Sequence, residues 1–226
     1  DKELTISKTK LAADENIEQI KFSITQRLNL WEDKETLLEI KDGFYYINNI
    51  NNLSFTTLSN IKSVKDKKET VVLMFEYDRS LNRIWNDPTK YIPKFAEFKS
   101  ICTPDFSIYG EMDKYMISHS TYMNRWLGCY YQTQGIWVIP TISWCYEDTY
   151  DVCFSGVEKG SVVAISTIGT RNKEEIFLKG FNEMKKRLEP SLIIVKGHLI
   201  KGMIGNIKLV SFYDTFNKNG GKTNGR

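Results

Sequence analysis

Residues 161–197 read SVVAISTIGTRNKEEIFLKGFNEMKKRLEPSLIIVKG, and this stretch decides the fold class. Apolar runs typical of buried strands occur at 161–167 and 191–197, and the clearest helical pattern of the chain lies between them at 172–188, with Asn172 as its expected N-cap. A strand, a helix and a second strand in this order predict two parallel strands joined by a crossover.

The same alternation of strands and helices continues on both sides of this unit. Further strand patterns occur at 71–77, 101–106, 136–143 and 207–214, and helical patterns at 88–100 and 111–131. The sequence therefore predicts an α/β fold with a mostly parallel sheet of five to six strands flanked by helices. An open doubly wound sheet and a partial barrel both fit this pattern.

The chain divides into three parts by composition. A helical pattern at 14–29 and short, turn-rich strands up to residue 64 predict an irregular N-terminal α+β extension, and the charged run KSVKDKKE at 62–69 is typical of a linker. We therefore expect an extension at 1–65, an α/β core domain at 70–214 and a flexible tail at 215–226.

Composition excludes several classes of protein. Among 226 residues the net charge is only +3, which gives no argument for nucleic-acid binding by itself. The first residues, DKELTISKTK, lack the apolar core of a signal peptide, and no apolar run approaches the length of a membrane helix. We expect a cytoplasmic protein that does not contact membranes.

The cysteine pattern points to free thiols. The four cysteines are widely spaced, without a CxxC pair, and most stand in apolar or aromatic surroundings. They are Cys102, Cys129, Cys145 and Cys153. We expect them to be unbridged, and we assign no metal site; no motif in the sequence identifies a cofactor.

Polar residues follow the predicted strands and define the first candidate site. In parallel α/β sheets ligands bind beyond the carboxyl ends of the strands. Asp78 and Asp105 are carboxylates suited to acid–base chemistry, and His198 is a candidate general base. They are our candidate catalytic residues, and Ser143 follows a neighbouring strand. The alternative is that strand ends are polar simply because loops face water.

The loop STIGTRN at 166–172 is the second candidate site. It leaves a strand, contains a glycine, offers hydroxyl groups and opens a helix, and a helix N-terminus attracts anions. We predict a phosphate-binding loop made by Ser166, Thr167, Gly169, Thr170 and Arg171. The loop matches neither the Walker nor the GxGxxG pattern, so an ordinary strand–turn–helix connection stays an alternative.

The helix predicted at 111–131 carries an aromatic stripe at helical spacing, which predicts its buried face. The stripe consists of Met112, Tyr115, Met116, His119, Tyr122, Met123, Trp126 and Tyr130. Arg125 lies beside the stripe, and a buried arginine normally has a carboxylate partner. We expect Arg125 to pair with Asp105 or Asp78.

Four ordered segments carry a resemblance to a known family. They are TPDFSIY (103–109), NRWLGCYYQTQGIWVIPTISW (124–144), FSGVEKGSVVAISTIGT (154–170) and FLKGFNEMKKRLEPSLIIVKG (177–197). Over roughly residues 71–200 the chain resembles an uncharacterised family, catalogued as a domain of unknown function, from Gram-positive bacteria, their prophages and plasmids. The resemblance implies a mobile-element setting and supplies no activity.

Three functional hypotheses follow, and none decides whether the chain is an enzyme; the third of them is a purely structural or assembly role. The first is an accessory protein of a phage or plasmid with a cleft for the phosphate of a nucleotide or nucleic acid at the carboxyl edge of the sheet. The second is a non-enzymatic factor that binds a host protein, for example an inhibitor or trigger of a host defence component.

Overall fold

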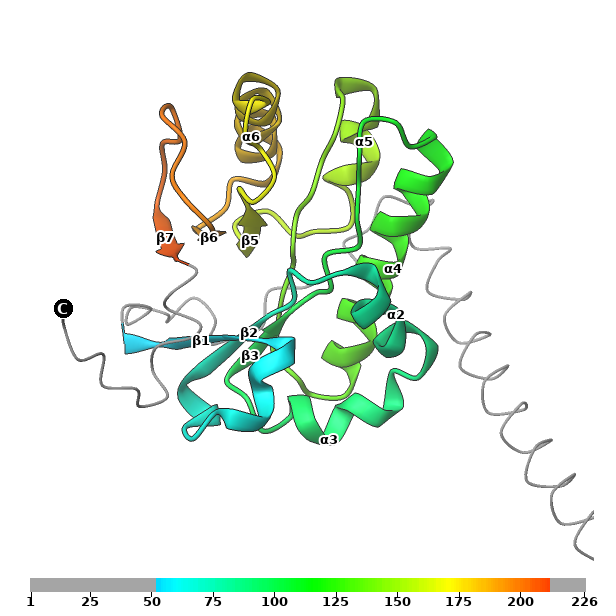
Figure 1. The fold of residues 1–226 in the computed structure, drawn as a ribbon, viewed down its shortest axis with the longest axis vertical. Coiled ribbons are helices and arrows are strands. Elements are labelled where there is room, and N and C mark those ends of the chain that lie inside the picture. The colour runs from blue at the N-terminus through cyan, green and yellow to red at the C-terminus, as the bar shows by residue number, and fades with distance from the viewer. Residues whose placement is uncertain (1–51, 212–226) are drawn as a thin grey trace, which may run out of the picture.

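Seven parallel strands form the sheet in residues 52–211, the part of the chain that the computed structural model describes (Figure 1). They are β1 (Ser54–Thr57), β2 (Thr70–Leu73), β3 (Ser100–Cys102), β4 (Val138–Ile139), β5 (Val162–Ser166), β6 (Leu192–Lys196) and β7 (Ile207–Val210). Hydrogen bonding arranges them as a four-stranded sheet in the order β1-β2-β3-β4 and a three-stranded sheet in the order β5-β6-β7.

A short parallel bridge links the two sheets at their adjoining edges. Thr141, just beyond β4, pairs with Ala164 in β5. The Ala164 amide donates to the carbonyl of Pro140 (2.9 Å), and the Ile142 amide donates to the carbonyl of Ala164 (2.8 Å). The strands therefore follow one another across the molecule in sequence order, which confirms the predicted α/β class with parallel strands.

The helices lie between these strands along the chain. They are α2 (Asp78–Asn86), α3 (Ile92–Phe95), α4 (Lys114–Thr133), α5 (Tyr150–Cys153) and α6 (Glu174–Leu188), with 3-10 turns at Leu58–Ser63, Lys67–Glu69, Thr89–Tyr91 and Glu147–Thr149. Neither α2 nor α5 was predicted. The helix predicted at 88–100 is reduced to a 3-10 turn and the short α3, and β3 already begins at Ser100.

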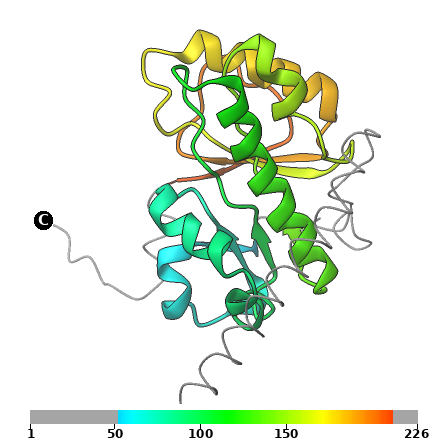
Figure 2. The ribbon, with the colours of Figure 1, turned by 90° about the vertical axis from the view of Figure 1, so that its right-hand side faces the viewer.

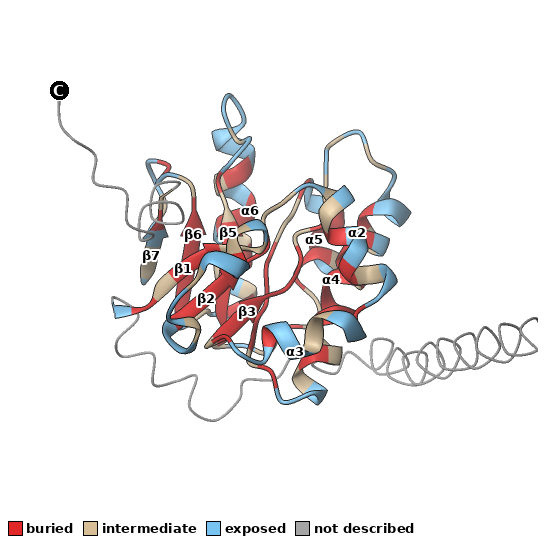
Figure 3. Cartoon of the chain, turned by 60° about the horizontal axis from the view of Figure 1, so that its bottom comes forward, coloured by how far each residue is buried: buried red, intermediate tan, exposed pale blue. Residues whose placement is uncertain are grey.

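The described helices cover one face of the sheet. Alternate strand residues such as Val72, Val163 and Ile193 share a buried cluster with residues of the helices. The intervening residues form a second buried cluster to which all seven strands contribute and the described helices do not. The central strands are buried on both faces (Figure 3), and α4 runs across the sheet (Figure 2).

The arrangement of helices and strands bears on the two architectures that the sequence left open, a doubly wound sheet and a partial barrel. A doubly wound sheet has helices on both faces and a reversal in strand order. Within residues 52–211 the order runs without reversal, and the described helices add no residue to the buried cluster on the second face. In this described part of the chain the strands form two adjoining parallel sheets that do not close into a barrel, which fits a partial barrel better than a doubly wound sheet.

The first strand lies within the predicted extension. Strand β1 pairs with β2 along its length, so the sheet begins inside the stretch 1–65 that the sequence separated from the core. The predicted helix at 14–29 and the predicted tail at 215–226 lie outside the described residues. The division of the chain into three parts stays a prediction in those regions.

The buried face of α4 differs from the predicted stripe. Tyr115, Met116 and His119 are exposed, whereas Asn124 and Arg125 are buried. The helix turns polar side chains toward the strand ends and leaves part of its aromatic stripe in solvent. The prediction is confirmed for Met123 and Trp126, which are buried. It is wrong at the start of the helix, and it missed Asn124 and Arg125, whose burial is offset by hydrogen bonds to main-chain carbonyls.

All four cysteines are free thiols, as predicted. Burial raises the pKa of Cys102, Cys145 and Cys153, which keeps these thiols protonated near neutral pH. Within residues 52–211, no helix combines the length and apolar character needed to cross a membrane.

Candidate functional site

A cleft of about 430 Å³ opens at the carboxyl ends of β3, β4 and β5. Three loops build it, because parallel strands deliver their following loops to the same edge of a sheet. The loop after β3 contributes Asp105, Ser107, Ile108, Tyr109 and Gly110, and the loop after β4 contributes residues 142–146. The loop after β5 and the start of α6 contribute Ser166, Ile168, Gly169, Thr170, Lys173, Ile176 and Phe177.

Asp105 and Ser143 are hydrogen-bonded to each other in the cleft. The Ser143 hydroxyl donates to Asp105 Oδ1, and the Asp105 amide donates to the carbonyl of Met74 (3.1 Å). Burial raises the pKa of the Asp105 carboxyl to about 6; the charge of Asp78 acts in the same direction and the Ser143 hydrogen bond opposes both. A carboxyl with this pKa exchanges protons near neutral pH.

Asp78 lies near Asp105 but makes its hydrogen bonds with Ser107 instead of with Ser143. Its Oδ1 accepts hydrogen bonds from the amide (3.0 Å) and the hydroxyl (2.9 Å) of Ser107. The carboxylate therefore fastens the start of α2 to the loop after β3, and it does not line the cleft. The structure brings the two predicted carboxylates close enough to interact, although only Asp105 reaches the cleft.

The predicted phosphate loop divides into two sets. Ser166, Gly169 and Thr170 line the cleft, whereas Thr167 and Arg171 do not. Thr167 is buried; its hydroxyl donates to the carbonyl of His198 (2.8 Å) and accepts from the His198 amide (2.9 Å). Thr167 thus joins the ends of β5 and β6, and Arg171 is exposed outside the cleft.

His198 is not assembled with the other candidate catalytic residues. His198 is exposed, and its main-chain amide and carbonyl are hydrogen-bonded to the Thr167 hydroxyl. It is not among the residues that line the cleft. A general-base role together with Asp105 has no geometric basis in this arrangement.

The cation of the cleft is Lys173, which the sequence pattern did not single out. Helix α6 begins at Glu174 with Lys173 at the N-cap, one residue later than the predicted N-cap Asn172, which adopts a left-handed conformation (φ 65°). Glu174 and Glu175 occupy the first turn and offset the positive end of the helix dipole. Lys173 is therefore the positively charged side chain among the described residues that line the cleft.

Apolar and aromatic side chains form the walls of the cleft. Tyr109 and Tyr146 are exposed at its mouth, as are Ile168 and Ile176 on the side of α6. Trp144 packs deeper, with its ring centroid 4.9 Å from that of Phe177. Such walls match the planar, weakly polar face of an aromatic ring.

A buried polar network holds the strand ends behind the cleft. Asn124 donates to the carbonyls of Pro104 (2.7 Å) and Thr141 (3.3 Å), and its oxygen accepts from the Thr103 hydroxyl (2.9 Å). These bonds connect α4 to the ends of both β3 and β4. They fix the relative positions of the segments that carry Asp105 and Ser143.

Arg125 extends this network and lacks the carboxylate partner that we expected. It is 1% exposed, and its guanidinium donates to the carbonyls of Ser155 (3.0 Å), Thr141 (3.0 Å) and Cys153 (2.8 Å). A further bond goes to the side chain of Asn124. Main-chain carbonyls replace the predicted pairing with Asp78 or Asp105, because α5 turns its carbonyl end toward α4.

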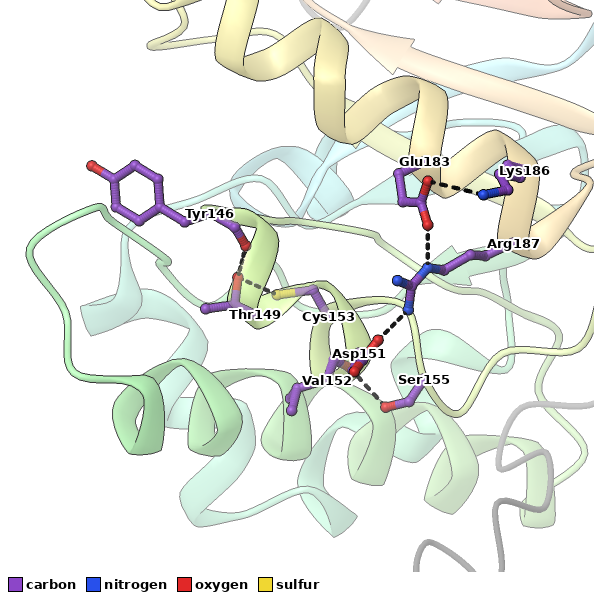
Figure 4. A network of polar contacts seen from close by, with 9 residues as sticks. All are labelled: Tyr146, Thr149, Asp151, Val152, Cys153, Ser155, Glu183, Lys186 and Arg187. Carbon is purple, nitrogen blue, oxygen red and sulfur yellow. Dashed lines mark hydrogen bonds and ion pairs between the residues drawn. The ribbon is translucent and has the colours of Figure 1, made fainter.

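Ion pairs on the surface join the two helices beside the cleft. Arg187 of α6 donates to Asp151 of α5 (2.6 Å) and to Glu183 on its own helix (2.8 Å), as Figure 4 shows. Nearby, the hydroxyl of Thr149 donates to the carbonyl of Tyr146 (2.6 Å) and accepts from the Cys153 thiol (3.7 Å). The Thr149 hydrogen bond thus holds the main chain at Tyr146, a residue that lines the cleft.

Within residues 52–211, no group of three or more histidine, cysteine, aspartate or glutamate side chains is placed to share a metal ion.

Fold and cleft together define an all-parallel α/β domain with a cleft of small-molecule size at its strand ends. The chain belongs to the domain of unknown function family DUF4417, whose sequence profile matches residues 42–214. This match confirms the resemblance to an uncharacterised family that the four sequence segments carry.

Two phage proteins are similar to the chain. The Gene 1 protein of Mycobacterium phage D29 is 34% identical over 142 residues, which cover 62% of this chain and 53% of that protein. The Gene 1 protein of Mycobacterium phage L5 is 37% identical over 125 residues, which cover 54% of this chain and 55% of that protein. The chain thus spans about half the length of the curated relatives it matches. No solved structure matches the chain significantly.

Proposed function

We propose that this chain is a mobile-element accessory protein that binds a mononucleotide in the strand-end cleft. One observation carries the proposal: the cleft places the Asp105–Ser143 pair, the cation Lys173 and an aromatic wall within the same small volume. A nucleotide offers a matching anion, a planar ring and hydrogen-bonding groups.

The size of the cleft favours a small ligand over a duplex. A volume of about 430 Å³ lies within the range of about 300–1,000 Å³ that is usual for pockets holding small molecules. The phosphate is assigned to the Lys173 side, where Ser166 and Thr170 offer hydroxyl groups. The ring is assigned to the side of Tyr109 and Tyr146.

Calorimetry on Lys173→Gln tests the proposal. After a thermal-shift screen of nucleoside monophosphates, inorganic phosphate and short single-stranded oligonucleotides, the affinity of the best nucleotide is measured for wild type and variants. Because a charge-assisted hydrogen bond contributes about 1.5–3 kcal/mol, Lys173→Gln should weaken binding about tenfold or more.

The neighbouring cation supplies the control for this measurement. Arg171→Gln removes the same charge two residues away, from a side chain outside the cleft, and should change affinity less than about twofold. Equal losses in the two variants would indicate a diffuse charge effect and contradict a phosphate site at Lys173. If none of the tested nucleotides binds, the proposal is contradicted.

A second candidate function, the binding of a host protein, is favoured by the exposed stripe of α4. Tyr115 is 74% exposed and Met116 55%, although both are apolar residues that usually pack against something. His119 and Tyr122 continue the stripe toward Trp85 of α2, whose ring centroid lies 6.0 Å from that of Tyr122. An inhibitor or trigger of a host defence component would use a surface of this kind.

A growth or phage-infection assay in a bacterial host that responds to the protein separates the two candidates. If protein binding through α4 is the function, the double variant Tyr115→Ser, Met116→Ser should abolish the response while Lys173→Gln retains it, because these sites lie on different elements. The reverse pattern would contradict protein binding and support the cleft.

A further inference from the structure

A small void lies directly behind the cleft, between α4 and the ends of β3 and β4. Its volume is about 10 Å³, and Asp105 and Ser143 line both the void and the cleft. Helix α4 lines it with Ser120, Thr121 and Arg125, among other residues. This volume is close to the minimum that holds one water molecule, and most of the lining residues are polar, as at an internal water site.

The polar groups around the void are satisfied within the protein, with one exception. Arg125 donates to carbonyls, and the Ser120 hydroxyl donates to the carbonyl of Ser107 (3.1 Å). Thr121 is only 4% exposed, and its hydroxyl makes no hydrogen bond of ordinary geometry within the protein, although it lies close enough to the Cys153 thiol to influence the pKa of that thiol. A buried hydroxyl without a partner is costly, so such groups in native proteins normally meet ordered water.

We propose that this void binds one water molecule, which accepts from the Thr121 hydroxyl and donates to the Asp105 carboxylate. The inference stands apart from the proposed nucleotide function, because it rests only on the void and its walls. Ser143 holds Asp105 from the cleft side, and the water holds it from the buried side. The carboxyl is then fixed in orientation for whatever group enters the cleft.

The sign of a stability change tests the water site. Thr121→Val keeps the shape of the side chain and removes the hydroxyl. With a bound water, the variant loses a hydrogen bond and leaves the water without one of its partners, so the Tm should fall by about 2–4 °C. Without a water, the variant removes an unpaired buried hydroxyl, and the Tm should stay or rise, which would overturn the proposal.

Ser100 provides a matched control within the same chain. Its hydroxyl is also buried without a partner in the protein, but Ser100 lines neither the void nor the cleft. Ser100→Ala should therefore leave the Tm unchanged or raise it slightly. A fall of the same size in both variants would mean that the loss at Thr121 is not specific to the void, and it would contradict a water there.

The Cys153 thiol is the rival partner of Thr121: burial raises the pKa of this thiol, and a contact with the Thr121 hydroxyl opposes that rise. Repeating Thr121→Val in a Cys153→Ala background separates the two partners. If the water is the partner, the fall in Tm persists in that background. If the fall disappears, Cys153 is the partner and the proposal fails. A high-resolution crystal structure of the wild type should also place a water between Thr121 and Asp105.

Discussion

Replacing Arg125 by methionine should lower the free energy of unfolding by about 3–5 kcal/mol, because the change removes the donor of several buried hydrogen bonds at once. The guanidinium is buried and donates to the carbonyls of Thr141, Cys153 and Ser155. Burial lowers the pKa of Arg125 to about 10, so the group is still charged at neutral pH. Methionine fills much of the space but cannot donate, so the carbonyls of Cys153 and Ser155 lose their guanidinium donor and the carbonyl of Thr141 keeps only the longer bond from Asn124.

Urea denaturation of the wild type and the variant measures this loss, and Arg187→Met is the control. Arg187 also makes two strong contacts, to Asp151 and Glu183, but its side chain is 36% exposed (Figure 4). Exposed ion pairs contribute about 0–1 kcal/mol, so the control should lose less than about 1 kcal/mol. Similar losses in both variants would contradict a central role of Arg125 in the polar network.

The strands could be predicted because each is a short, continuous apolar run. The runs at 71–77, 161–167 and 191–197 contain most or all of β2, β5 and β6, and burial on both faces explains why they lack alternation. Strand β1 was missed as a member of the core, since SFTT is short and lies among turn residues. Its place in the sheet depends on pairing with β2, which no local pattern reveals.

The candidate cleft followed in part from the strand-end rule. The rule selects Asp105, Ser143 and Ser166 correctly as neighbours, because they end or follow adjacent parallel strands. It fails for Thr167, since successive residues of a strand point in opposite directions, and Thr167 turns toward the end of β6. It also fails for Asp78, because the chain enters α2 soon after β2 ends.

The start of α6 shows why loop geometry needs the structure. Asn172 is of a residue type that commonly caps helices, but its backbone is left-handed. The helix therefore starts at Glu174, and Lys173, at the N-cap, lines the cleft. The buried face of α4 was misjudged for a comparable reason. Asn124 and Arg125 are buried because carbonyls from distant loops meet them, and these loops are placed only by the fold.

Asp105→Asn should raise the free energy of unfolding by about 1–3 kcal/mol above pH 7 and leave it nearly unchanged below pH 4. Burial, the charge of Asp78 and the opposing Ser143 hydrogen bond together set the pKa of the native carboxyl at about 6, above its ordinary value of 3.8. Between these two values the native state binds more protons than the unfolded state. Stability of the wild type therefore falls as the pH rises from about 4 to about 6, and then levels.

Denaturation of both proteins from pH 4 to pH 8 gives the difference directly. Asparagine keeps the oxygen that accepts from Ser143 and removes only the titration, so the difference between the two curves should grow through the window from pH 4 to pH 6. Asp148→Asn, at an exposed position of the 3-10 turn Glu147–Thr149, should follow the wild-type curve. A difference between Asp105→Asn and wild type that stays constant across this range would show that Asp105 titrates alike in the native and unfolded states, and the cleft would lose its proton-exchanging group.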